Sequence, residues 1–138
     1  SSTTITTGSD NVSGGAATDV MCYAWKAVAG VSAFGSYAGN NNITGAFVNT
    51  GFYPRFLMVK CITDGSNWMI WDSARSGATT TGSSMLPRIR SNTAEAEVTN
   101  ANNVEWYLSG SDKGWRPLTA EGGLNGLSSR TYIYMAFA

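Results

Sequence analysis

The sequence predicts an all-β protein, an antiparallel β-sandwich of jelly-roll-like form. Charged residues make up only 13% of the chain, about half the usual share, while Gly, Ser, Thr and Asn are abundant. Apolar segments of about 5–9 residues alternate with turn clusters, and no segment has the period of an amphipathic helix. Short strands at short spacing are typical of a sandwich or a barrel.

The chain of 138 residues fits one domain of ordinary size. Residues 1–19 are rich in Ser, Thr, Gly and Asp, so we expect a flexible lead-in or an inter-domain linker there. We assign residues 20–138 to the sandwich domain. This arrangement suggests that the globular unit is the C-terminal part of a longer protein.

The first strand candidates lie between residues 20 and 62. "VMCYAWKAV" at 20–28 is a run of strand formers, followed by "FGSYAGN" and by the turn cluster "NNNITG". "GAFVNTGF" and "RFLMVKCI" are two further strand candidates, separated by "YP". Pro54 lacks a backbone N–H, so it should start a strand or lie at an edge.

The next segments predict hairpins. "TDGSN" contains an Asp-Gly turn and joins "RFLMVKCI" to "WMIWDSA" as one antiparallel hairpin. "MLPRIRS" is a weak strand candidate, and "TAEAEVTN" could be a helical turn or the start of a strand. "VEWYLSGSDKGWRPL" predicts strand, turn and strand. "TYIYMAFA" is apolar on both faces, which indicates a central, covered strand.

The segment "SNWMIWDSAR" has the composition of a sugar-binding cleft. On a strand, however, Trp68 and Trp71 point to opposite faces, so they cannot form one stacking platform. At least one should be in the core, and we expect both there. Asp72 and Arg75 end the segment, either as a local turn with Arg75 as its brace or as a contact to a ligand or subunit.

Two further residues are candidate contacts. Trp115 and Arg116 lie beside a turn, and Trp115 is the aromatic residue with the best chance of exposure. The alternative is that Trp115 packs at a sheet end. An exposed aromatic ring beside fixed polar groups would suit a carbohydrate.

The composition excludes several classes of function. The chain has no histidine, which excludes histidine-dependent triads and histidine metal sites, and we expect no metal, no cofactor and no enzymatic activity. The net charge of zero argues against a nucleic-acid partner. No apolar run is long enough for membrane insertion. Cys22 and Cys61 are expected to be buried free thiols rather than a disulfide.

Four ordered motifs resemble a domain of tailed-bacteriophage virion proteins, common in marine and cyanobacterial phages. They are "FGSYAGN" (Phe34 to Asn40), "TGFYPRFLMVK" (Thr50 to Lys60), "NWMIWDSAR" (Asn67 to Arg75) and "YIYMAFA" (Tyr132 to Ala138). The resemblance covers roughly residues 22–138. Two features differ from the family pattern: the loop "SGATTTGSS" and the "KGW" of the later hairpin.

The resemblance implies a C-terminal module of a tail fibre or another appendage, located in the virion. A fibre tip would contact a glycan or protein of the host surface. The alternatives are a capsid decoration (cement) protein or a fibre shaft element with an assembly role only, and, as a third class, a carbohydrate-binding module of an enzyme. Fibre membership implies other virion subunits as partners and a homo-oligomer, with a trimer favoured.

Overall fold

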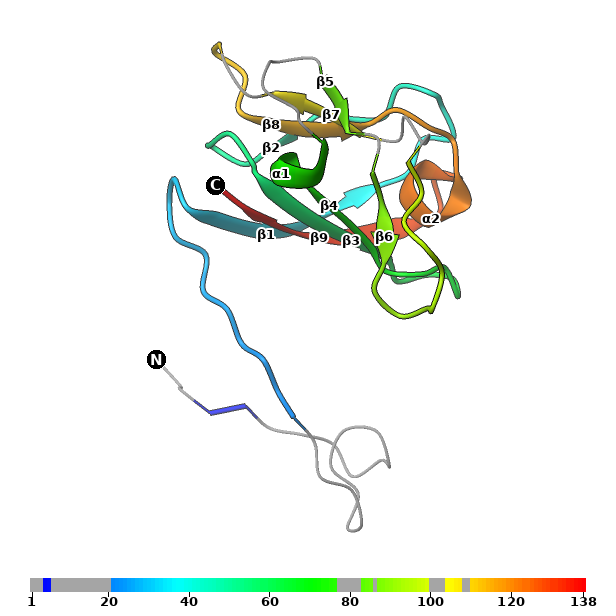
Figure 1. Cartoon of the computed structure of the whole chain (residues 1–138), viewed down its shortest axis with the longest axis horizontal. Helices are drawn as coiled ribbons and strands as arrows, with labels where there is room; N and C mark the ends of the chain where they lie inside the picture. The colour runs from blue at the N-terminus through cyan, green and yellow to red at the C-terminus, as the bar shows by residue number, and fades with distance from the viewer. Residues whose placement is uncertain (1–3, 6–20, 77–82, 86, 100–103, 108–109) are drawn as a thin grey trace.

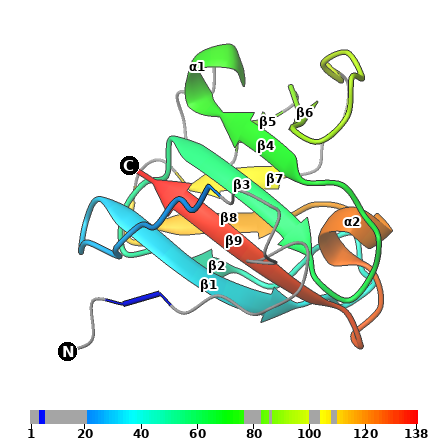
Figure 2. The same cartoon turned by 90° about the horizontal axis from the view of Figure 1, so that it is seen from below.

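The computed structural model describes residues 4–5, 21–76, 83–85, 87–99, 104–107 and 110–138. The predicted antiparallel β-sandwich is confirmed (Figures 1 and 2). One sheet has the strand order β1-β9-β3-β4-β6 and the other β2-β8-β7-β5. The strands are β1 (Ser32–Ala38), β2 (Val48–Asn49), β3 (Phe56–Cys61), β4 (Met69–Asp72), β5 (Ser83–Met85), β6 (Ile89–Arg90), β7 (Val104–Tyr107), β8 (Gly114–Pro117) and β9 (Thr131–Phe137), with one-turn helices α1 (Ser73–Ser76) and α2 (Gly122–Asn125).

The hydrophobic core lies between the two sheets. The five-stranded sheet contributes Leu57, Val59 and Trp71, and the four-stranded sheet contributes Trp106 and Trp115, all without exposed surface. In β3, β4 and β7 the buried residues occupy alternate positions, so one face of each of these strands is buried.

Both predicted hairpins are confirmed. Strands β3 and β4 pair antiparallel around the Asp-Gly turn, with Leu57 opposite Trp71. The turn is held by the Asp64 carboxylate, which accepts a hydrogen bond of 2.9 Å from the backbone N–H of Ser66. Strands β7 and β8 form the second hairpin, with Trp106 opposite Trp115.

The last strand lies inside its sheet, as its sequence predicts, but the expected cover on both faces is wrong for this single chain, because its outward residues are only half-buried. Strand β9 pairs with β1 on one side and with β3 on the other. Tyr134 stands opposite Gly35 of β1 and Val59 of β3. A Cβ atom at Gly35 would lie 2.9 Å from a ring carbon of Tyr134, so glycine lets this ring lie against the strand.

The predicted strand at 20–28 is wrong. Residues 21–27 have no strand partner among the described residues, and the first strand of the sandwich is β1, further along the chain. In Figure 1 this N-terminal arm, residues 21–28, leaves the sandwich as an extended segment. Cys22 lies on it and is exposed, so only Cys61 is the buried free thiol that we expected. Apart from Thr4 and Ile5, the predicted linker over residues 1–19 lies outside the described residues.

The two tryptophans of β4 and its approach face opposite ways. Trp71 is wholly buried, whereas Trp68 is half-buried on the outer side of the sheet. The expected split is therefore confirmed, but the expectation that Trp68 is also core is wrong.

This split predicts unequal costs of truncation. Trp71→Ala should lower the free energy of unfolding by about 3–5 kcal/mol, because it leaves a cavity between the sheets. Trp68→Ala should cost less than about half of that, since part of its ring is already exposed to water. Urea unfolding of both variants measures the difference. Equal losses would contradict the assignment of the two faces.

Candidate functional site

The outer side of the five-stranded sheet is apolar across four adjacent strands. The strand register aligns Phe34 of β1, Met135 of β9, Met58 of β3 and Ile70 of β4 in one row. In a second row, Phe137 of β9 stands opposite Phe56 of β3, and the centroids of the two rings lie 5.9 Å apart. We call these six side chains, with Trp68 and Ile133, the outer apolar face. All eight are half-buried in this chain.

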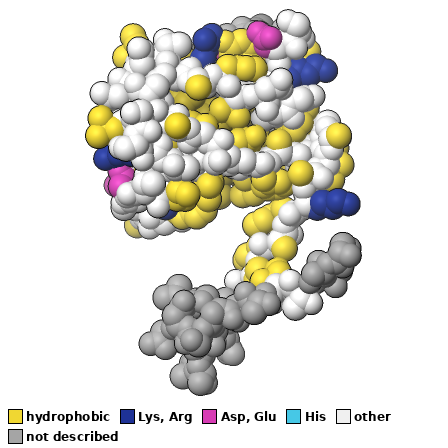
Figure 3. All heavy atoms as spheres, turned by 180° about the vertical axis from the view of Figure 1, so that it is seen from behind, with side chains coloured by type: hydrophobic (Ala, Val, Ile, Leu, Met, Phe, Trp, Pro, Cys, Tyr) yellow, Lys and Arg dark blue, Asp and Glu magenta, His cyan; other side chains and the backbone are white. Residues whose placement is uncertain are grey.

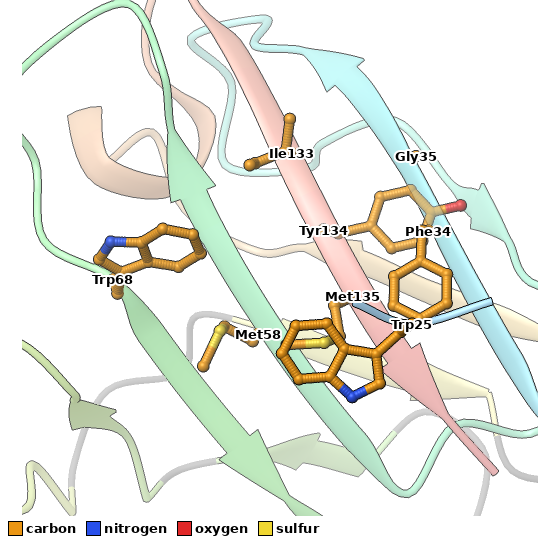
Figure 4. Close-up of a pocket in the computed structure, with 8 residues that line it drawn as sticks. All are labelled: Trp25, Phe34, Gly35, Met58, Trp68, Ile133, Tyr134 and Met135. Atoms are coloured by element: carbon orange, nitrogen blue, oxygen red, sulfur yellow. The ribbon is translucent and has the colours of Figure 1, made fainter. Parts of the chain in front are cut away.

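A hollow of about 310 Å³ lies on this face (Figure 4). Trp68 and Trp25 stand at its two sides, and sulfur and carbon atoms of Met58 and Met135 lie between them. The remaining lining residues are Phe34, Gly35, Ile133 and Tyr134. Figure 3 shows hydrophobic side chains gathered where the arm meets the sandwich and along the arm itself.

The hollow has the wrong chemistry for a sugar. A carbohydrate needs fixed polar groups beside an aromatic ring. The side chains that line the hollow offer only the two indole N–H groups and the Tyr134 hydroxyl. Apolar side chains and methionines instead suit contact with another apolar protein surface.

The outer side of the four-stranded sheet is polar. Arg116 of β8 forms an ion pair with Glu105 of β7, and its guanidinium lies 5.3 Å from the ring centroid of Tyr107. The hydrogen bond that Arg116 donates to the Glu105 carboxylate is the main reason why the pKa of Arg116 is raised. Burial, with the neighbouring Glu105, raises the pKa of the Tyr107 hydroxyl. Arg116 is therefore placed at the surface, but it is engaged within its own sheet.

Trp115 is not an exposed aromatic. Its side chain has no exposed surface, and its ring makes edge contacts with Tyr37 at 5.3 Å and with Tyr134 at 5.9 Å between ring centroids. Strand β8 places it on the inner face because its neighbour Arg116 points outward. The interpretation of Trp115 as a partner contact is thus wrong, and its packing in the sandwich is the alternative that holds.

Asp72 and Arg75 form a closed corner where β4 ends and α1 begins. The Asp72 carboxylate accepts a hydrogen bond of 2.8 Å from the backbone N–H of Arg75 and also pairs with the Arg75 guanidinium. Arg75 reaches a second carboxylate, Glu97, which no local sequence pattern indicated. The arrangement braces the turn and ties it to the segment that follows β6.

The charges of the corner stabilise one another. Burial alone would raise the pKa of Asp72, but the hydrogen bonds and the charge of Arg75 outweigh it and lower that pKa below its ordinary value. Likewise, burial would lower the pKa of Arg75, yet the hydrogen bonds to Asp72 and Glu97 raise it. Both groups stay ionised over the whole neutral range.

Sequence reasoning missed two polar clusters. Arg88 is nearly buried and pairs with Glu121 at 2.7 Å, although 33 residues separate them in the chain. Asn125 is wholly buried and donates hydrogen bonds to the Asn40 side chain at 2.7 Å and to the Asn42 carbonyl at 2.8 Å. The run of three asparagines was the only signal, and it indicated a turn without its partner.

The described carboxylates are mostly engaged in ion pairs. Six of them pair with arginine: Asp64, Asp72, Glu95, Glu97, Glu105 and Glu121. Within the described ranges, no group of three or more His, Cys, Asp or Glu side chains could hold a metal ion. No helix of the described part is long and apolar enough to cross a membrane.

Comparison with known proteins gives a family without a known function. A family model described as a domain of unknown function (DUF7483) matches residues 1–138. The chain therefore belongs to this family of domains, here folded as an antiparallel β-sandwich. Neither the curated proteins nor the solved structures contain a significant match.

The corner predicts a pH-dependent contribution to stability. Because the pKa of Asp72 is lower in the folded state, its ionisation stabilises the fold above the ordinary value of 3.8, and this contribution is lost as the pH falls. Asp72→Asn should therefore cost about 0.5–1 kcal/mol near neutral pH and progressively less in acid. Urea unfolding at neutral pH and below pH 3.8 tests this. An equal loss at both would contradict the assignment.

Proposed function

We propose that this chain is a structural module of a bacteriophage particle, carried on an appendage such as a tail fibre, and that it assembles with other copies through the outer apolar face. The observation that carries the proposal is this face, because a single copy leaves eight apolar side chains only half-buried. A soluble protein rarely leaves such a patch without a partner.

The family motifs support the same reading. All four segments that resemble the phage domain lie in the five-stranded sheet or run directly into it: Phe34 to Asn40 in β1, Thr50 to Lys60 in β3, Asn67 to Arg75 in β4 and Tyr132 to Ala138 in β9. These strands are neighbours in the order β1-β9-β3-β4. The motifs thus supply both the fold of this sheet and most of its outer apolar face.

Contact with the host surface is a second candidate, at a different place. Ile43 is 74% exposed in its loop, and Leu127 is exposed next to Gly126, whose carbonyl accepts a hydrogen bond of 2.8 Å from the Asn41 N–H of the same loop. Asn125 fixes this loop by its hydrogen bonds to Asn40 and Asn42. A rigid loop with exposed apolar tips suits recognition of a surface, and it leaves the outer apolar face to assembly.

Assembly can be tested with a charge on the outer face. Met58→Asp places a carboxylate in the middle of the face, so it should convert an oligomer into a monomer in light scattering at micromolar concentration. Ile43→Asp is the matched control, because it adds the same charge on the exposed loop and should leave the mass unchanged. A wild-type monomer, or an unchanged mass for Met58→Asp, would refute the assembly role.

The position in the particle can be tested by electron microscopy. Antibodies against the chain should label an appendage of the phage that carries it. Label on the capsid shell would instead indicate a decoration protein, and an unlabelled particle would contradict a virion role.

A further inference from the structure

The edges of the two sheets are unequally protected. Three of the four edge strands, β2, β5 and β6, are only two or three residues long. The fourth, β1, has seven residues, "SAFGSYA", with no proline and no charge. A long, uncharged edge strand invites pairing with another strand, and natural proteins usually shorten, charge or cover such an edge. Strand β1 does none of these within the described part of the chain.

The hydrogen bonds show which groups of β1 are available. Ser32 exchanges two backbone hydrogen bonds with Val28, at 2.9 and 3.2 Å, on the side away from β9. The backbone N–H and C=O groups of a strand alternate in direction. Those of Phe34, Ser36 and Ala38 therefore also point away from β9, beyond the edge of the sheet. The next residue, Gly39, confirms the alternation, since its N–H bonds to Arg130 on the β9 side.

The N-terminal arm also lacks a strand partner among the described residues. Its residues 21–27 donate no backbone hydrogen bond within the described part of the chain, although their sequence predicts a strand. Its large side chains alternate as in a strand: Met21, Tyr23 and Trp25 are 77%, 69% and 56% exposed. The rings of Tyr23 and Trp25 stack 6.0 Å apart. The arm is thus an extended segment without a strand partner among the described residues.

We propose that the arm of one copy pairs with the free edge of β1 in a second copy and extends that five-stranded sheet by one strand. Seven extended residues span up to roughly 23 Å, enough to reach a neighbouring copy. The main chain supplies hydrogen bonds, as in other cases of strand addition. The large side chains of the arm would then stand beside Phe34 and extend the outer apolar face of the neighbour by one strand.

The arm turns away from its own edge. It starts along that edge at Val28, but the Ser32 hydroxyl donates a hydrogen bond of 3.0 Å to the Lys26 carbonyl, and Trp25 rests at the hollow on the outer face. A continued hairpin would instead place Lys26 opposite Phe34. Within the described residues, each copy therefore has an arm without a strand partner and an edge of β1 that is unpaired beyond Ser32.

The partner of the β1 edge is then the arm of a second copy, because each copy supplies one such arm and one such edge. An arm that pairs with the edge of the next copy makes a head-to-tail contact, which forms a ring if the rotation between copies closes and an open filament if it does not. This inference rests on the self-assembly in the proposed function and names the segment and the edge that perform it.

Cysteine cross-linking tests the exchange, because Cys22 already lies on the arm and is exposed, while Cys61 is buried. Two full-length chains are mixed under assembly conditions: the natural chain, and a tagged chain with Cys22→Ser and Ser36→Cys. A mild oxidant should produce a disulfide between the natural and the tagged chain. A second tagged chain, with Ala38→Cys in place of Ser36→Cys, tests the neighbouring outward position. Ser111→Cys, in an exposed turn of the other sheet, is the control and should give at least tenfold less of the mixed product.

Each other result contradicts the exchange. A disulfide between two tagged Ser36→Cys chains in place of the mixed product would mean that two β1 edges pair with each other. A third chain keeps Cys22 and carries Ser36→Cys. If its disulfide forms only within single chains, the arm folds onto its own edge. Equal cross-linking at Ser111→Cys would mean random collision. An oligomer in light scattering without the mixed disulfide would overturn the arm exchange and leave the proposed function standing, whereas a monomer would overturn both.

Discussion

Strand β9 hydrogen-bonds to β1 on one side and to β3 on the other, and the arrangement of the whole five-stranded sheet depends on this double pairing. Its Tyr132 also ties the sheet to the loop at the end of the sandwich. The hydroxyl donates to the Gly122 carbonyl at 2.7 Å and accepts from the Gly126 N–H at 2.8 Å, while the ring stacks on Tyr37 at 5.0 Å. Tyr37 in turn donates to the Leu124 carbonyl at 2.6 Å. Two tyrosines therefore hold α2 against the sheet that carries the outer apolar face.

The sequence predicted those parts of the fold whose strands and turn are neighbours along the chain. The hairpin between β3 and β4 was predictable because its Asp-Gly turn and the two apolar runs that it joins lie within one continuous segment. Strand β1 gave a weak signal, since Gly35 interrupts its apolar pattern, and the reason for that glycine is the Tyr134 ring across the sheet. The segment at 20–28 gave a strong signal and is no strand in a single copy. Strand propensity describes the segment itself and does not report whether a partner edge is within reach.

The candidate site residues also include some whose positions were predictable from the sequence and some whose positions were not. The opposite directions of Trp68 and Trp71 follow from the period of two and were predictable. Trp115 was harder, because a residue beside a turn can point to either face, and only the pairing with Trp106 places it inside. The partners Glu97 of Arg75 and Glu121 of Arg88 lie 22 and 33 residues away along the chain. Such pairs are created by the packing of separate segments, so no spacing rule finds them.

The position of the charges indicates which side of the sandwich faces water. The chain has only nine basic and nine acidic residues, and the described pairs place them at corners, in turns and on the outer side of β7 and β8. Lys60 is the basic residue among the outward positions of β3, and its ammonium group bends to the carbonyl of Ser66 at 2.7 Å, at the hairpin end of the sheet. The centre of the outer apolar face is left without a charge. If this face were in contact with water, lysine side chains on it would increase the solubility of the protein. Their absence, beside an uncharged edge strand and an arm without a strand partner among the described residues, supports the proposal that other copies bury this face.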